Sequence, residues 1–312
     1  MNFNQFDKVY QIDRRDFLKA RKGHLTQDSQ AAWRSFVRQL RKRFSNLSKN
    51  ISKLDSKSSR RTIHRLRVLS RRLRAMLAVL KVAPKKTRLK PEERAVKKLT
   101  RALSPIRSLD VSEGLLEGHL QALSGPDRRP LRTAVPALQK LRREARRDLA
   151  KTSRELRAKL RAPDLDKLQE GRFGVRFLPA LRRGLRSSRT RAARRLREYR
   201  RAPDMHRLHE FRIALKKYRY LLEIHAEVLR SPDPALRTLK ALQDHIGAMH
   251  DLEVLRQLLQ DPRVTRRITK EASRRALVRF EAKLASEVAA LEKGFLSRQG
   301  RRLRSLFPNE VP

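Results

Sequence analysis

The amino-acid sequence predicts an all-α protein made of two four-helix bundles that are related by an internal duplication. Apolar residues recur every three or four positions over long windows, which is the period of amphipathic helices. No segment of any length alternates apolar and polar residues as a half-buried strand does. Two segments also return later in the chain, in the same order and at nearly equal distances. Such a repeat predicts two copies of one helical unit, each of normal domain size.

The first repeated segment, Thr62–Leu80, returns as Arg207–His225, 145 positions further along the chain. Its basic positions are kept or conservatively replaced: His64, Arg67, Arg71 and Arg74 return as His209, Arg212, Lys216 and Arg219. At 100° per residue the four basic positions of each copy fall within one quadrant of a helix, beside an apolar stripe. Each copy is therefore expected to be a helix that presents a basic stripe next to its core-facing side.

A second repeated element joins Leu103–Val111 to Ile246–Val254, 143 positions apart. Asp110 in the first copy corresponds to Glu253 in the second. A residue that disfavours helix precedes the acid in both copies, Pro105 in one and Gly247 in the other. We expect a helix to break and restart at each of these two points.

The remaining helices and loops are predicted from the apolar pattern and from the proline and glycine residues that interrupt it. Residues 1–25 show no sustained period and are expected to form a tail or a packed arm. The first half, 26–162, is expected to hold helices over about 33–54, 62–80, 91–120 and 138–160, with a turn at 124–127. After a linker at 163–174, the second half, 175–306, is expected to hold helices over about 175–200, 207–225, 236 onward and 277–295, followed by a tail at 307–312.

The charge balance indicates a polyanionic partner. The chain holds 79 Lys and Arg against 32 Asp and Glu, a formal net charge of +47. With 39% hydrophobic residues at helical spacing, the chain is expected to fold rather than stay disordered. A folded protein with this charge repels itself unless it meets an anion. Nucleic acid, inorganic polyphosphate and an anionic membrane surface all satisfy this requirement.

Several classes of chemistry are excluded by what the sequence lacks. It contains no cysteine, so disulfides and thiolate chemistry are absent. It has no signal-peptide pattern, no apolar run long enough to span a membrane, and no phosphate-binding or dinucleotide glycine motif. We therefore expect a cytoplasmic protein without a cofactor.

The basic stripes are the best candidates for a binding site. Arginine can hold two phosphate oxygens with its planar fork, and lysine adds a point charge. A charge run is usually a solvated helix face, but this one is duplicated position by position beside an apolar stripe. His64 and His209 are either buried residues with satisfied hydrogen bonds or donors to phosphate. A metal role is disfavoured, because no cysteine is present and no second histidine follows His209 at helical spacing.

The acidic residues near these stripes fit a supporting role. Asp110, Asp251 and Glu253 lie beside arginine-rich segments, where pairing with arginine and orienting it is the better interpretation. A metal-assisted phosphate hydrolase needs a larger carboxylate cluster than the sequence provides. The enzyme hypothesis, a polyphosphatase, is therefore the least favoured.

These motifs resemble the CHAD domain (conserved histidine α-helical domain) over about residues 26–306. The resemblance lies in the segments His64–Leu77, Leu208–Glu223, Leu103–Val111 and Leu242–Val254. It implies two four-helix bundles, related by pseudo-twofold symmetry, around a basic central channel that binds inorganic polyphosphate without catalysis, and an association with polyphosphate granules. The implied channel residues are His64, Arg67, Arg71, Arg74, His209, Arg212, Lys216 and Arg219, with Arg107, Asp110, Asp251 and Glu253 in support.

Nucleic-acid binding remains the alternative, because charge alone supports it equally. Proteins that bind single strands stack bases on exposed aromatic rings. This chain is only 5% aromatic, and most of its rings fall at core positions. The sequence therefore favours bare phosphate chains over nucleic acid.

Overall fold

A computed structural model describes residues 24–55, 57–80, 89–161, 163, 165–168 and 174–310. Its helices are α3 (His24–Ser52), α4 (Arg60–Val79), α5 (Lys90–Ala122), α6 (Arg128–Leu131), α7 (Ala134–Leu156), η3 (Asp166–Leu168), α8 (Gly174–Arg201), α9 (Met205–Leu229), α10 (Ala235–Gln260), α11 (Pro262–Thr265), α12 (Glu271–Lys293), α13 (Phe295–Leu306) and η4 (Pro308–Glu310). The all-α class is confirmed, and the described residues contain no strand. Most of the predicted tail 1–25, much of the linker 163–174 and the last two residues lie outside the described residues.

The two repeated helices begin in the same way. Ser59 caps α4, accepting a hydrogen bond at Oγ from the Thr62 amide at 3.1 Å. Asp204 caps α9, accepting at Oδ1 from the Arg207 amide at 2.7 Å. A cap of this kind satisfies one of the free amides in the first turn and fixes where the helix begins. The first residues of both basic stripes are therefore placed one turn after a capped start.

The expected helix breaks at Pro105 and Gly247 are wrong. Both α5 and α10 continue through these residues. Proline removes one main-chain hydrogen bond and glycine costs about 1 kcal/mol relative to alanine. Buried neighbours outweigh these costs, such as Leu103 and Ile106 around Pro105 and Ile246 and Met249 around Gly247.

The C-terminal part of the chain differs from the prediction in two respects. The expected last helix is two helices, α12 and α13, which meet at Gly294. Phe307, expected to begin a tail, is buried and lies 6.3 Å and 6.4 Å, between ring centroids, from Phe211 and Tyr218. The end of the described chain is therefore part of the core.

Three apolar clusters hold the helices together. The first joins α3, α4 and the start of α5 to the start of α8 and the end of α9. The second joins α8, α9 and the start of α10 to α13. The third joins the ends of α5 and α10 to α7 and α12. Both α5 and α10 thus run from one cluster into another.

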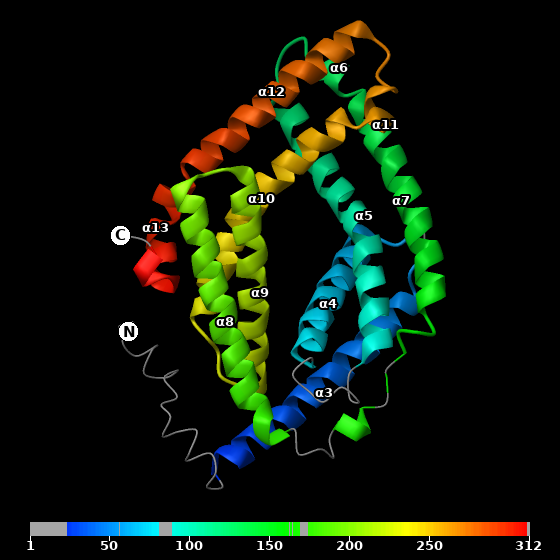
Figure 1. The fold of residues 1–312 in the computed structure, drawn as a ribbon. Coiled ribbons are helices and arrows are strands. Elements are labelled where there is room, and N and C mark those ends of the chain that lie inside the picture. The colour runs from blue at the N-terminus through cyan, green and yellow to red at the C-terminus, as the bar shows by residue number, and fades with distance from the viewer. Residues whose placement is uncertain are drawn as a thin grey trace.

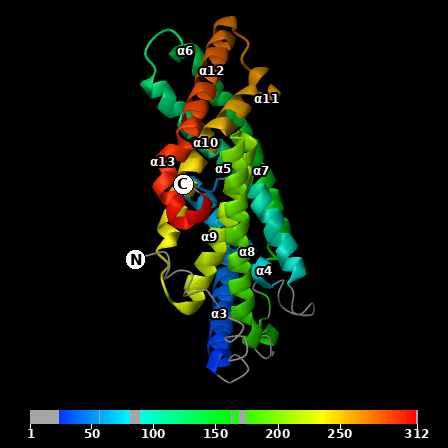
Figure 2. The same cartoon turned by 60° about the vertical axis from the view of Figure 1, so that its left-hand side comes forward.

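This packing arranges α4, α5, α10 and α9 in a ring, in which each helix contacts the next and α9 contacts α4. Figure 1 shows α8 and α9 on one side, α4 and α5 on the other, and α10 passing beneath α12. Figure 2 shows the molecule from the side as a long body, with α12 towards one end and α3 towards the other. A bifurcated ion pair also connects α3 to α9, because Arg43 Nη2 lies 2.7 Å from both carboxylate oxygens of Glu227.

Candidate anion-binding site

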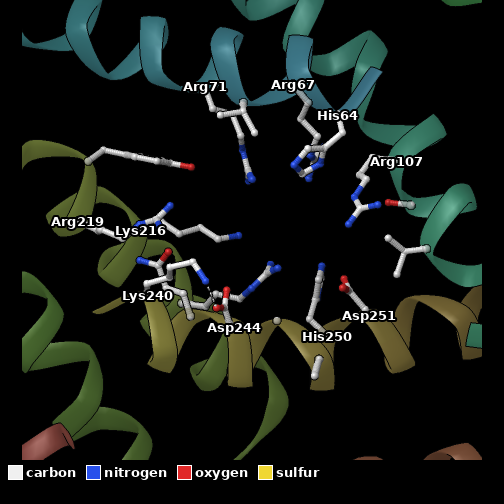
Figure 3. A pocket seen from close by; sticks show the side chains of 18 of the residues that line it. His64, Arg67, Arg71, Arg107, Lys216, Arg219, Lys240, Asp244, His250 and Asp251 are labelled. Atoms are coloured by element: carbon white, nitrogen blue, oxygen red, sulfur yellow. Dashed lines mark hydrogen bonds and ion pairs between the residues drawn. The ribbon is translucent and has the colours of Figure 1, made fainter. Parts of the chain in front are cut away.

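A cavity of about 590 Å³ lies among α4, α5, α9 and α10. Ten of its lining residues are basic or histidine: His64, Arg67, Arg71, Arg72, Arg107, Arg212, Lys216, Arg219, Lys240 and His250. Its two acidic lining residues are Asp244 and Asp251. Figure 3 shows Arg67 and Arg71 of α4 directed towards the same space as Lys216 of α9. The two repeated helices therefore present their cations to one cavity.

The structure brings most of the predicted site residues together. The cavity is lined by His64, Arg67, Arg71, Arg212, Lys216 and Arg219, and by Arg107 and Asp251 from the supporting set. Arg74, one turn beyond Arg71, is exposed and does not line it. His209 does not line it either, but its ring centroid lies 5.4 Å from that of His250, which does.

The supporting acids Asp110 and Glu253 lie outside the cavity lining and pair with arginines. Asp110 is buried 3.4 Å from Arg60 Nε and 3.6 Å from Arg142 Nη1. Glu113, buried beside it, accepts from both arginines and, at 3.0 Å, from Gln139. Glu253 accepts two hydrogen bonds from Arg256, at 2.8 Å each. These carboxylates hold α5 against its neighbours and stiffen α10.

Four of the lining cations have neither a carboxylate oxygen within 4.0 Å nor a side-chain hydrogen-bond partner among the described residues. They are Arg71, Arg107, Arg212 and Lys216. Two buried donors, Nε of Arg212 and Nε of Arg219, also lack a hydrogen-bond acceptor in the part of the chain that is described. A buried donor on a charged group is costly to leave without an acceptor, so these groups favour an anion as their partner. An anion in this space would satisfy both the charges and the donors.

Burial and the neighbouring positive charges lower the pKa values of basic groups in the cavity. Burial, with Arg212, Arg71 and Arg67 nearby, lowers the pKa of Lys216 to about 6. Burial and the neighbouring Arg71 and Arg107 lower the pKa of Arg67 to about 10. Asp251 does not relieve this repulsion fully, because burial raises the pKa of its own carboxyl group. Lys216 is therefore largely neutral at pH 7 when the cavity is empty.

The pKa values of the histidines at the site are lowered as well. Burial, then Arg107 and Arg67, lowers the pKa of His64. Burial, then Arg212 and His209, lowers the pKa of His250 to about 4. Both rings are thus neutral near pH 7 and can each donate one hydrogen bond and accept another.

Of the α10 residues that line the cavity, only Asp251 was predicted from the sequence. Lys240, Gln243, Asp244, Gly247 and Asp251 line the cavity at helical spacing, on one face of this helix. In the sequence these α10 residues form a helical stripe without large apolar side chains. Gly247 indicated a helix break, which would have divided this stripe. Arg72 and Tyr220 also line the cavity, and Lys240 Nζ is 2.7 Å from Asp244 Oδ2.

The site does not resemble a metal centre. Within the described residues, no group of three or more His, Cys, Asp or Glu side chains is arranged to hold a metal ion. Arginine and lysine are the main functional groups here, and they bind anions rather than cations. Among the same residues, no helix has a stretch that is long and apolar enough to cross a bilayer.

Comparison with known proteins agrees with the fold. A family model, the CHAD domain, matches residues 38–260. The crystal structure of the CHAD domain from the plant Ricinus communis is similar, with a TM-score of 0.54 and 19% identity over 89% of this chain and 91% of that chain. At this identity the likeness concerns the fold alone. No curated protein matches the chain by sequence.

Proposed function

The chain belongs to the CHAD domain family, and on that premise we propose that it binds inorganic polyphosphate in the cavity without hydrolysing it. The observation that carries the proposal is the group of four lining cations, Arg71, Arg107, Arg212 and Lys216, without a carboxylate partner among the described residues. Guanidinium groups held on packed helices meet phosphate oxygens with little further ordering. A protein with this ligand acts where the polymer collects, on cytoplasmic polyphosphate granules.

We further propose that the cavity is a central channel between two duplicated four-helix units, residues 26–162 and 175–306. The order of elements supports this, because α3 to α7 and α8 to α12 each place a short helix, α6 or α11, before the last long one. The capping residues Ser59 and Asp204 also lie 145 positions apart, as the sequence repeat does. In this arrangement α4 and α9 contribute equivalent cations to one channel.

The lining favours a bare phosphate chain over nucleic acid as the occupant of the cavity. Among the described residues, Tyr220 is the only Phe, Tyr or Trp that lines it, and Arg219 lies over that ring at 5.2 Å from the centroid. Bases would therefore find little to stack on, whereas single-strand binding depends on stacking. A chain of phosphates needs only cations and N–H donors, which this cavity supplies.

Binding without hydrolysis also fits the acids of the site. Phosphate hydrolysis with metal assistance uses several carboxylates that converge on the ion. Here the lining carboxylates are those of Asp244 and Asp251, and Asp244 is bonded to Lys240 at 2.7 Å. Asp251 lies among Arg212, Arg107 and Lys216, whose positive charge opposes the effect of burial on its pKa.

A competition titration tests the ligand class. Long-chain polyphosphate and single-stranded RNA of equal total charge compete for the protein at physiological salt. We expect polyphosphate to win clearly, because the cavity offers cations without stacking surfaces. If RNA wins or ties, the proposed function is wrong.

A pair of matched variants tests the position of the site. The cavity variant carries Arg71→Gln, Arg107→Gln, Arg212→Gln and Lys216→Gln. The surface variant carries Arg183→Gln, Arg191→Gln, Arg201→Gln and Arg301→Gln, at exposed positions on α8 and α13, which contribute no lining residue. We expect the polyphosphate Kd to rise at least about tenfold in the cavity variant and to stay within about threefold in the surface variant. Equal losses would mean diffuse electrostatics rather than a defined site.

A further inference from the structure

Helix α8 carries a second concentration of positive charge, separate from the cavity. Between Gly174 and Arg201 it holds 11 arginines, no lysine and one acid, Glu198. None of its residues lines the cavity. Its apolar side is buried against α9 and α3, as shown by Leu185, Leu196 and Phe177. The arginines therefore occupy the side that the fold leaves to solvent.

Helix α13 lies beside α8 and extends this charge. The rings of Tyr199 and Phe295 are 5.9 Å apart between centroids, at the end of α8 and the start of α13. Arg189 donates from Nε and Nη2 to the Leu306 carbonyl at the other end of α13, at 3.3 Å and 3.2 Å. The two helices thus run antiparallel, and α13 adds four arginines and no acid. We call four exposed arginines of these helices, Arg183, Arg191, Arg201 and Arg301, the arginine surface.

The chemistry of the arginine surface is restricted to guanidinium groups. Arg183, Arg191, Arg201 and Arg301 are exposed and have no carboxylate within 4.0 Å among the described residues. Glu198, the one acid of α8, is already engaged by Arg195 at 2.7 Å. A solvated surface that serves only solubility mixes both signs of charge. A surface of one sign, made of arginine alone, fits an anion with phosphate geometry.

We propose that the arginine surface binds the phosphate backbone of double-stranded DNA. The aromatic residues of α8 and α13 that the structure describes, Phe177, Tyr199 and Phe295, are buried, so no ring is available to stack an unpaired base. The same burial of apolar side chains leaves nothing to insert into a membrane. With 28 residues, α8 is about 42 Å long, which matches about a dozen base pairs of duplex.

A rigid duplex suits this surface better than a flexible phosphate chain. The arginine surface is the open outer side of two helices, so a flexible polymer would lose much conformational freedom to lie along it. The enclosed cavity offers cations from four helices to one chain, whereas the arginine surface offers them from one side. Because the two sites share no residue, one molecule holds a polyphosphate chain and a DNA duplex together.

The test measures three ligands against the wild type, the cavity variant and the surface variant. The probes are a mixed-sequence duplex of about 20 base pairs, roughly twice the length that α8 spans, long-chain polyphosphate, and vesicles that contain phosphatidylserine. We expect the surface variant to lose about tenfold or more in duplex affinity, and the slope of log Kd against log salt to fall by about three to four. We expect the cavity variant to keep the duplex Kd of the wild type within about twofold.

The outcomes separate this inference from the proposed function. Equal loss of duplex binding in both variants overturns the arginine surface as a defined DNA site. Loss of vesicle or polyphosphate binding in the surface variant, with duplex binding kept, assigns the surface to another partner and overturns it as well. A cavity variant that keeps polyphosphate affinity instead overturns the proposed function. The conclusion about DNA binding at the arginine surface is then judged from the surface variant alone. Thermal melts of both variants confirm that they are folded.

Discussion

Lys216 on α9 shares one cavity with Arg71 on α4, and the charge of Arg71 helps to lower the pKa of Lys216 to about 6. Burial is the larger cause, and Arg212 and Arg67 act in the same direction. Two helices from distant parts of the chain therefore hold basic groups close together in a buried space. As a result, Lys216 loses its proton at a lower pH than an exposed lysine does. This repulsion gives the cavity measurable properties in the absence of any ligand.

Polyphosphate binding should take up protons and weaken as pH rises. The anion stabilises charged Lys216, so the pKa of Lys216 in the complex lies above its value of about 6 in the empty protein. Between these two values binding adds a proton, and the Kd rises by up to about tenfold per pH unit for one such group. The lowered pKa values of His64 and His250 act in the same direction at lower pH.

Calorimetry in buffers of different ionisation enthalpy measures this proton uptake. Lys216→Gln should reduce the uptake and flatten the pH dependence above pH 6. Lys217→Gln is the matched control, because Lys217 is the exposed next residue on α9 and does not line the cavity. Proton release on binding, or an unchanged profile in Lys216→Gln, would contradict the prediction.

The empty protein should become more stable when the cavity cations are neutralised. Two unit charges about 8 Å apart repel by roughly 2 kcal/mol at an effective dielectric of about 20, before screening by salt. The cavity variant should therefore melt several degrees higher than the wild type at low salt, with a smaller difference at high salt.

Polyphosphate length gives a second measurement on the same pair of proteins. Long chains should raise the melting temperature of the wild type, and pyrophosphate should do so much less, because it meets fewer of the lining cations at once. A site that is occupied at 100 times its Kd adds about 2.7 kcal/mol of stability. The cavity variant should lose most of this gain. A fall in melting temperature with long chains would mean that the unfolded chain binds them better than the cavity does.

The ion pair between Arg43 and Glu227 should contribute to stability more than a surface pair does. Arg43 contacts both carboxylate oxygens of Glu227 at 2.7 Å, and its side chain is 13% exposed. Arg43→Met leaves Glu227 without this partner, and we expect a loss of about 1–3 kcal/mol in the free energy of unfolding. The matched control is Arg41→Met on the same helix, whose pair with Asp166 is exposed on both sides. That loss should stay below about 1 kcal/mol. Equal losses in urea unfolding would contradict the difference in burial.

Gly247→Ala should stabilise the protein without weakening polyphosphate binding. A methyl group at Gly247 meets no atom within 4 Å, and alanine favours the helix by about 0.5–1 kcal/mol. Gly114→Ala on α5 is the control, because it has the same free space and does not line the cavity. Both variants should unfold at higher urea concentration. If only Gly247→Ala raises the Kd for polyphosphate, the ligand needs the space that glycine leaves open there.

The sequence allowed the fold class and most of the cavity residues to be predicted, because both follow from a helical period. Arg67 and Arg71 lie one turn apart on a helix whose apolar side is unambiguous, so their common direction could be deduced. Their convergence with Arg212 and Lys216 depended on the repeat and on the family resemblance. Arg74 fits the same stripe, yet α4 leaves it exposed, since the packing of α4 against its neighbours decides where the stripe passes from the cavity to solvent.

Other features depend on contacts that no local pattern encodes. Asp110 and Glu113 meet Arg60 and Arg142 only because α4 and α7 pack on α5. The face of α10 mixes lysine, glutamine, aspartate and glycine, so it shows neither a charge run nor an apolar stripe. Gly247 in that face has the chemistry of a helix breaker, and the buried residues around it overrule this tendency.

The third apolar cluster draws Leu116 and Leu138 from the first half of the chain and Leu255 and Phe280 from the second. Neither half of the chain can close this cluster by itself, so the two halves share one apolar core. Recombination that replaced one half alone would have to preserve a matching apolar surface across the join. The two halves are therefore constrained to change together, as the subunits of an obligate dimer are.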